Sequence, residues 1–217
     1  MNSNLTTYYN NRAKEYEKVY HNPDEQDDLK TAADYFQHIF LDKTVLEIAC
    51  GTGYWTEQIA KTATSVFATD INKSVVDIAI KMRSKKSIKF SVIDMYHLNT
   101  DKKYQGLFGG FIWSHILLQD IDRFLNTLKY FITNNGTFVF IDSNPVDGTI
   151  HDKDGITKID EHGNTYQTRR LEDGTSHLVL KNFPTKEFLL EKLSLIATDI
   201  NYIQLKYYWI VSCSLKA

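Results

Sequence analysis

Two segments near the amino terminus carry apolar residues at helical spacing. The apolar positions of the first are Tyr9, Ala13, Tyr16 and Tyr20, and His21-Asn22-Pro23 ends the pattern. Those of the second are Leu29, Ala32, Ala33, Phe36 and Phe40, with Asp24 as the expected cap. The pattern therefore predicts two helices before the first strand.

Between residues 44 and 142, short apolar runs alternate with amphipathic segments. Strands are predicted over 45–49, 65–69, 88–92, 107–113 and 137–141, and helices over 54–62, 73–83 and 121–131. The last of these helices is expected to end at Asn134-Asn135-Gly136. Such an alternation predicts an α/β fold, in which helices cover both faces of a doubly wound parallel sheet.

The alternation stops at Asp142, and residues 143–183 are an insertion rich in Asp, Gly, Thr and His. Within it, residues 165–171 and 176–182 are expected to pair as a hairpin across Glu172-Asp173-Gly174. The remaining predicted elements are a helix from Thr185 and two antiparallel strands over 198–203 and 206–214.

Composition excludes several classes of protein. The chain is 42% hydrophobic and 24% charged, as globular proteins are, and its net charge of −2 gives no field that would attract nucleic acid or anionic membranes. No apolar run approaches the roughly 20 residues of a membrane-spanning helix, and the start lacks the pattern of a secretion signal. We therefore expect a cytoplasmic protein without nucleic-acid or membrane partners, with Cys50 and Cys213 as reduced thiols.

The most informative motif is the predicted strand 45–49 followed by Gly51-Thr52-Gly53. A buried strand that ends in Gly-x-Gly lets a nucleotide-type ligand approach the backbone closely. A dinucleotide-binding turn would have a third glycine where this chain has Thr56, and an acidic Glu47 is an odd neighbour for a pyrophosphate. The motif therefore argues against a nicotinamide-dependent oxidoreductase.

In this motif the chain resembles the class I S-adenosylmethionine-dependent methyltransferases, and is most similar to their type 11/25 members. The resemblance runs from about residue 44 to residue 142, with four landmarks in order. They are Glu47 with the Gly-x-Gly turn, Asp70 about 20 residues later, Asp94-Met95 after the third strand, and Ile112-Trp113-Ser114-His115-Ile116 after the fourth. The resemblance implies a mostly parallel seven-stranded, Rossmann-like methyltransferase sheet with an antiparallel carboxyl-terminal strand.

The resemblance also implies S-adenosylmethionine as cofactor and S-adenosylhomocysteine as product. The cofactor-binding residues that it implies are Glu47, Ala49, Gly51, Gly53, Trp55, Asp70, Ile71, Asp94, Met95 and Ser114. Asp70 would accept hydrogen bonds from the ribose hydroxyls, Ile71 and Met95 would sandwich the adenine, and Asp94 would accept a hydrogen bond from the exocyclic amine of the adenine. The alternatives are core packing for Ile71 and Met95, and helix capping for the two aspartates.

We expect one domain spanning residues 1–217. Its predicted parts are amino-terminal helices or a lid (1–42), a cofactor-binding core (44–142), an insertion forming a substrate cap (143–183), and a carboxyl-terminal helix with strands (184–217). Either a monomer or a homodimer is compatible with this organisation.

Three groups of residues are candidates for the acceptor site. His115, just after the fourth strand, is the candidate catalytic base, although it can equally shape the pocket. Tyr8, Tyr9 and Tyr16 either belong to a lid that contacts substrate or form the buried stripe of a helix. Arg169 or Arg170 can bind an acidic acceptor, or both can lie on a solvated hairpin, where alternation turns only one of them inward.

Two other clusters are interpreted without a ligand. His151, His162 and His177 match no metal-ligand spacing, so no metal site is expected. The basic run of Lys81, Arg83, Lys85, Lys86 and Lys89 is interpreted as a solvated helix end rather than as a nucleic-acid footprint.

The favoured function is methyl transfer to an oxygen, nitrogen or sulfur nucleophile of a small molecule by in-line displacement. The alternatives are a protein or RNA methyltransferase, and a catalytically silent binding module with the same fold.

Overall fold

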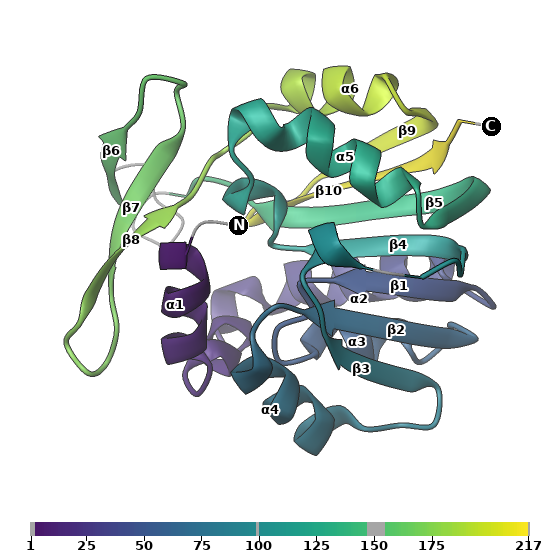
Figure 1. The fold of residues 1–217 in the computed structure, drawn as a ribbon, viewed down its shortest axis with the longest axis horizontal. Helices are drawn as coiled ribbons and strands as arrows, with labels where there is room; N and C mark the ends of the chain where they lie inside the picture. Colours follow the sequence, from purple (N-terminus) through teal and green to yellow (C-terminus); the bar gives the residue numbers. More distant parts are fainter. Residues whose placement is uncertain (1–2, 99, 147–154, 217) are drawn as a thin grey trace.

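The computed structural model describes residues 3–98, 100–146 and 155–216, and its centre is a seven-stranded sheet in the order β3-β2-β1-β4-β5-β10-β9 (Figure 1). The strands are β1 (Thr44–Ile48), β2 (Ser65–Asp70), β3 (Ile88–Val92), β4 (Tyr104–Gly110), β5 (Ile132–Ser143), β9 (Ala197–Gln204) and β10 (Tyr208–Leu215). Strands β1 to β5 pair in parallel, whereas β10 is antiparallel to both β5 and β9. The predicted mostly parallel, seven-stranded sheet is therefore confirmed.

Helices cover both faces of this sheet (Figure 1). They are α2 (Gln26–Ile39) and α3 (Tyr54–Ile59) on one face, α5 (Ile121–Lys129) and α6 (Lys186–Ser194) on the other, and α4 (Lys73–Arg83) against β2 and β3. Successive residues of a strand point to opposite faces, so Leu107 packs in the cluster of α5 and Phe108 in the cluster of α2. Burial on both faces explains why the central strands are nearly continuous apolar runs.

Two predicted strand boundaries were wrong. The strand expected over 107–113 is β4, which ends at Gly110 because Phe111 is left-handed with a φ of 55°; Trp113–His115 then forms the short 3-10 helix η4. The turn expected at Asn134-Asn135-Gly136 lies inside β5, where the pairing with β4 shifts register and Asn135 has a φ of 59°. A bulge can hold turn residues without ending the strand.

The amino-terminal tyrosines do not share one helix, contrary to the prediction. Helix α1 (Ser3–Arg12) contains Tyr8 and Tyr9, and a turn separates it from the 3-10 helix η1 (Tyr16–Tyr20). Asp24 is not a cap either, because it lies within the 3-10 helix η2 (Pro23–Glu25) and donates its backbone N–H to the side chain of Asn22, 3.3 Å away.

The insertion forms a small antiparallel sheet beside α1. The expected hairpin is confirmed as β7 (Thr165–Arg170) and β8 (Ser176–Leu180), and β6 (Ile156–Ile159) adds a third strand that was not predicted. Figure 1 shows α1 between this small sheet and the main sheet, where the parallel strands end. Within the described ranges, no helix has both the length and the apolar character needed to cross a membrane.

Candidate active site

A cavity of about 700 Å³ lies at the carboxyl ends of β1 to β4, beneath α1. The predicted site residues that line it are Tyr9, Tyr16, Ala49, Gly51, Asp70, Ile71, Met95 and His115. Carboxyl ends of parallel strands are the usual ligand-binding edge of an open α/β sheet, so this cavity lies where a ligand is expected.

The turn after β1 brings the backbone to this cavity. Ala49 and Gly51 both have a positive φ, of 51° and 54°, which is unusual for the alanine. A Cβ atom added to Gly51 would lie 3.4 Å from the ring of Tyr16. A side chain on Gly53 would instead meet Arg83 and Ala79, at 3.2 and 3.3 Å. Gly51 therefore keeps the cavity open, whereas Gly53 allows close packing between the start of α3 and helix α4.

Asp70 connects two turns at the cavity wall through hydrogen bonds to their backbone N–H groups. One oxygen of its carboxylate accepts a hydrogen bond from the Gly51 N–H at 3.0 Å, and the other accepts one from the Asn72 N–H at 2.8 Å. Burial raises the pKa of this carboxyl, although the backbone donors partly oppose that shift. A carboxylate has about four acceptor positions, so two remain for donors of a ligand.

Glu47 is 1% exposed, and its Oε2 has no hydrogen-bond partner within the described part of the chain. Burial raises the pKa of this carboxyl to about 8, so it is mostly protonated at neutral pH. It does not line the cavity, but it lies in β1 two residues before Ala49, which does. An unpartnered buried carboxyl is costly, and a cationic donor would satisfy it.

The Glu47 carboxyl is expected to make the stability of the ligand-free protein fall as pH rises. Between the unfolded pKa near 4.5 and the folded pKa near 8, the native state holds a proton that the unfolded state has released. Each pH unit within that window then costs about 1.4 kcal/mol of unfolding free energy. Urea unfolding from pH 5.5 to 8 should show a smaller decline for Glu47→Gln than for wild type. The exposed control Glu161→Gln should follow wild type, and equal declines in all three proteins would refute this assignment.

The remaining predicted cofactor residues lie off the cavity. Asp94 accepts a hydrogen bond from the Tyr96 N–H at 3.0 Å and caps the 3-10 helix η3 (Met95–His97). Trp55 packs among the aromatic rings of Phe36, Phe108 and its neighbours. Ser114 is 1% exposed and binds the insertion through its carbonyl oxygen, which accepts from the Asn182 N–H.

His115 is held between α1 and the insertion. Its Nδ1 lies 2.5 Å from the carbonyl oxygen of Leu180, and its Nε2 lies 2.6 Å from the hydroxyl of Tyr9. A carbonyl only accepts, so Nδ1 carries the hydrogen and Nε2 accepts from Tyr9. Burial, together with the positive charge of Lys181, lowers the pKa of His115 to about 3. The imidazole is therefore neutral at physiological pH.

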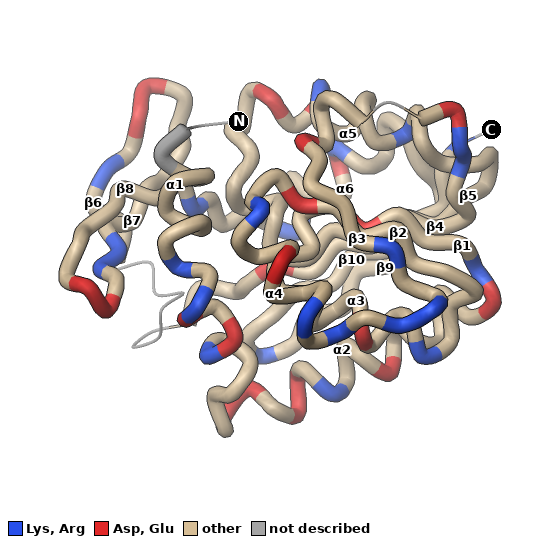
Figure 2. Tube along the Cα trace, turned by 60° about the horizontal axis from the view of Figure 1, so that its bottom comes forward, with Lys and Arg blue, Asp and Glu red and all other residues tan. Residues whose placement is uncertain are grey.

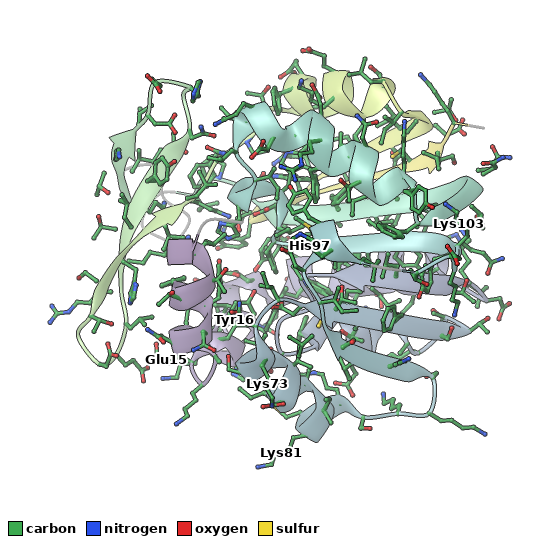
Figure 3. The ribbon with its side chains drawn as sticks, in the orientation of Figure 1. Glu15, Tyr16, Lys73, Lys81, His97 and Lys103 are labelled. Atoms are coloured by element: carbon green, nitrogen blue, oxygen red, sulfur yellow. The ribbon has the colours of Figure 1, made fainter. Side chains whose placement is uncertain are left out.

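A second cavity of about 410 Å³ adjoins the first and shares Tyr9, Tyr16, Phe111 and His115 with it. Its other lining residues are Arg12, Val19, Ser143, Arg169, Lys181 and Tyr208. Figure 3 shows Tyr16 beside α1. Phe111, which lines both cavities, follows directly after β4 and has a left-handed backbone. Residues with strained backbone of this kind gather at functional sites.

Lys181 connects the insertion to the main sheet. Its Nζ donates to Oδ1 of Asp142 at 2.8 Å and to the hydroxyl of Ser114 at 2.9 Å, and both partners are buried. Burial alone would raise the pKa of Asp142, but the ammonium beside it holds that pKa below its usual value. Lys181, Arg12 and Ser143 also line the second cavity and were not predicted from the sequence. The one available signal was a lysine directly after the apolar run of β8.

Other predicted residues have structural positions. Tyr8 is 2% exposed and packs α1 against Leu171 and Val179 of the small sheet. His162 and His177 belong to no cluster of metal-ligating side chains in the ranges described, and His151 lies outside them.

The basic run near the end of α4 was interpreted correctly only in part. Figure 2 shows blue segments where α4 leads toward β3, and Lys81 points away from the protein in Figure 3. Arg83, however, is 7% exposed and forms an ion pair with Glu17 at 2.7 Å, so it is not a solvated residue. It fastens the segment after α1 to the turn after β1, because it also donates to the carbonyl oxygen of Thr52.

A family of known proteins matches the central part of the chain. Residues 45–136 match the family described as "Methyltransferase domain". A malonyl-[acyl-carrier protein] O-methyltransferase of Bacillus cereus is 28% identical over 100 residues. That stretch covers 44% of this chain and 36% of the relative, so the match spans about a third of the relative's length.

Solved structures resemble nearly the whole chain. The DhpI–SAH complex has a TM-score of 0.81 at 20% identity and covers 98% of this chain and 96% of that one. The DhpI–SAM–HEP complex has a TM-score of 0.80 at 22% identity, with 97% and 95% covered. SAM-bound CalS10, an amino pentose methyltransferase from Micromonospora echinaspora, has a TM-score of 0.63 at 13% identity, with 93% and 96% covered. At these identities the likeness confirms the fold.

Proposed function

The chain belongs to the class I S-adenosylmethionine-dependent methyltransferases, and from this premise we propose that it methylates an oxygen, nitrogen or sulfur atom of a small molecule. The observation that carries the proposal is the pair of adjoining cavities, which meet at Tyr9, Tyr16 and His115. The larger cavity gathers the cofactor landmarks, and the smaller one has room for an acceptor. CalS10, a structural neighbour, is described as acting on an amino pentose, which supports a small acceptor.

The residues of the larger cavity fit the cofactor. S-adenosylmethionine carries a sulfonium and no phosphate, and neither lysine nor arginine is found among the described residues that line this cavity. Asp70 offers two acceptor positions to ribose hydroxyls, and Ile71 and Met95 offer apolar surface to the adenine. Glu47 does not line the cavity but lies in β1 two residues before Ala49, and binding of the cationic methionine part would favour the ionised form of its carboxyl, whose Oε2 has no partner among the described residues. We further propose that Asp94, Trp55, Gly53 and Ser114 act by supporting these residues.

The chain contributes to catalysis mainly by positioning the acceptor against the methyl group of the cofactor. The cofactor supplies an activated methyl group, and the nucleophile attacks it in line, so holding the two together can lower the barrier by up to about 7–11 kcal/mol. Tyr9 and Tyr16 border both cavities and exclude water from the junction. An acceptor hydroxyl or amine that displaces the Tyr9 hydroxyl would donate to Nε2 of His115 and be oriented by it. With its low pKa, this imidazole holds a transferred proton only weakly.

His115→Ala is expected to lower kcat/KM for the acceptor about tenfold, because a neutral hydrogen bond contributes about 0.5–1.5 kcal/mol. Affinity for S-adenosylhomocysteine should stay near the wild-type value. Steady-state kinetics with a methylated-product assay measures the first quantity, and calorimetry the second. A fall of 10²- to 10⁴-fold, with an inflection of the wild-type rate near pH 6–7, would instead indicate full general-base catalysis.

The proposed function itself is tested by following methyl-labelled S-adenosylmethionine. The protein is incubated with pooled small metabolites, bulk RNA or a protein extract, and each fraction is counted. We expect label in the small-molecule fraction. Label confined to RNA or protein would contradict the proposal in favour of a macromolecular acceptor. Binding of the cofactor without any transfer would favour the silent module.

A further inference from the structure

The second cavity is lined by more positive than negative charge. Its cations are Arg12 from α1, Arg169 from β7, and Lys181. The Lys181 ammonium is balanced by Asp142, with Nζ and Oδ1 2.8 Å apart. Neither arginine forms an ion pair with any residue in the described ranges. Two uncompensated cations therefore face one cavity.

The two guanidinium groups keep donors available. Arg12 lies over the rings of Tyr8 and Tyr16, with its Cζ 5.7 and 5.6 Å from their centroids. Stacking on aromatic faces leaves the in-plane N–H groups of a guanidinium free to bind an oxyanion. Arg169 uses Nε and one terminal nitrogen on the side-chain oxygen of Gln167, at 3.2 and 2.9 Å. Its other terminal nitrogen, Nη1, makes no hydrogen bond with the described residues.

A buried hydroxyl in the same cavity also lacks a partner. Ser143 is 2% exposed, and its Oγ makes no hydrogen bond within the described part of the chain. Leaving a buried hydroxyl unsatisfied costs about 1–3 kcal/mol. An oxygen atom of a ligand in this cavity would satisfy it. Ser143 lies on β5, whereas the arginines lie on α1 and β7, so the hydroxyl and the cations are independent observations. Both indicate a ligand that carries oxygen atoms.

Repulsion between the positive charges also disfavours the second cavity when no anion is bound in it. Arg169 repels the buried ammonium of Lys181, and burial together with that repulsion lowers the pKa of Lys181 against the opposing effect of Asp142. An anion placed between the arginines would relieve the repulsion. Arg12 and Arg169 belong to α1 and to the small sheet, so one anion would also bridge the lid and the insertion.

We propose that the methyl acceptor is a small acid whose oxyanion, a carboxylate or a phosphate, binds between Arg12 and Arg169 in the second cavity. Its nucleophilic atom then lies toward His115 and the cofactor cavity, since His115 borders both. Ser143 donates to, or accepts from, the same ligand. Guanidinium groups bind carboxylate and phosphate through paired N–H donors, which fixes the orientation of the acid as well as its charge. The inference rests on the proposed function, because it assigns the substrate class of that site.

The test measures anion binding with the cofactor cavity filled. Wild-type protein saturated with S-adenosylhomocysteine is titrated with inorganic phosphate or propanoate at constant ionic strength, with chloride as the reference, and thermal unfolding is followed. We expect phosphate or propanoate to raise the unfolding temperature in a saturable way, and the tighter of the two identifies the oxyanion. Arg12→Gln and Arg169→Gln should each weaken that binding at least tenfold.

Matched controls distinguish a specific anion-binding site from nonspecific electrostatic attraction of the anion to the protein. Arg170→Gln removes an exposed cation from the same strand as Arg169, and Lys14→Gln removes one close to Arg12 in sequence. Both should bind the anion as wild type does, and all four variants should bind S-adenosylhomocysteine unchanged. No saturable effect of either anion, or equal losses in controls and test variants, would overturn the anionic acceptor. Failure to bind S-adenosylhomocysteine would instead refute the proposed function.

Discussion

Asp70→Ala is expected to weaken binding of S-adenosylhomocysteine at least about 100-fold, since charge-assisted hydrogen bonds contribute about 1.5–3 kcal/mol each and two ribose hydroxyls are expected to donate to this carboxylate. The substitution also deprives the Gly51 and Asn72 N–H groups of their acceptor, so the turns that shape the cavity would loosen. Isothermal titration calorimetry measures the affinity, and circular dichroism confirms that the variant is folded.

Asp77→Ala is the matched control for Asp70. Asp77 lies on α4, where it pairs with Lys73 at the surface, with its side chain 56% exposed. This control should retain wild-type affinity. If Asp70→Ala bound S-adenosylhomocysteine within about threefold of wild type, the carboxylate would have only its structural role in the two turns, and recognition of the ribose would have to come from elsewhere.

Lys181→Met is expected to cost about 3–5 kcal/mol of unfolding free energy, because it leaves the fully buried carboxylate of Asp142 without its cation. The double variant Lys181→Met/Asp142→Asn should recover part of that loss, since the unpaired charge is then gone. Urea unfolding at pH 7 measures the free energies of wild type, of Lys181→Met and Asp142→Asn alone, and of the double variant. The expected coupling between the two sites is the signature of a buried pair.

Lys192→Met provides the comparison on the surface. Lys192 pairs with Asp122 at 2.9 Å, but the Asp122 side chain is 55% exposed, so the loss should stay within about 1 kcal/mol. Equal losses for Lys181→Met and Lys192→Met would contradict the account of Lys181 as the link between insertion and sheet.

The order of the parallel strands made the position of the larger cavity predictable. The turn after β1 and Asp70 at the end of β2 each follow a buried strand, and adjacent parallel strands bring their carboxyl ends to one edge. Their relative positions therefore follow from strand order alone. The same reasoning placed Met95 and His115 at this edge.

Local geometry limited the prediction at the end of β4. The apolar run 107–113 is continuous in sequence, and nothing in it shows that Phe111 adopts a left-handed backbone and ends the strand. The bulge around Asn135 is similar, because turn-forming residues there are compatible with either a loop or an irregular strand. In both cases tertiary packing decided between conformations that the sequence left open.

The second cavity could not be assembled from sequence. Arg12, His115, Ser143, Arg169 and Lys181 come from five separate segments, and no periodicity relates them. The chemistry of its side chain alone makes Arg169 a candidate. The residues that line the same cavity come close to it only when α1 and the insertion fold against the sheet. The division between Tyr8, which packs, and Tyr9, which borders both cavities, likewise depends on how α1 docks.

Equilibrium dialysis of methyl-labelled S-adenosylmethionine tests the central claim most directly, with S-adenosylhomocysteine and NADH as competitors. The two-cavity account predicts that one molecule of the labelled cofactor binds per chain, that S-adenosylhomocysteine displaces it, and that NADH does not. Absence of saturable binding, or displacement by NADH at comparable concentration, would contradict the assignment of the larger cavity.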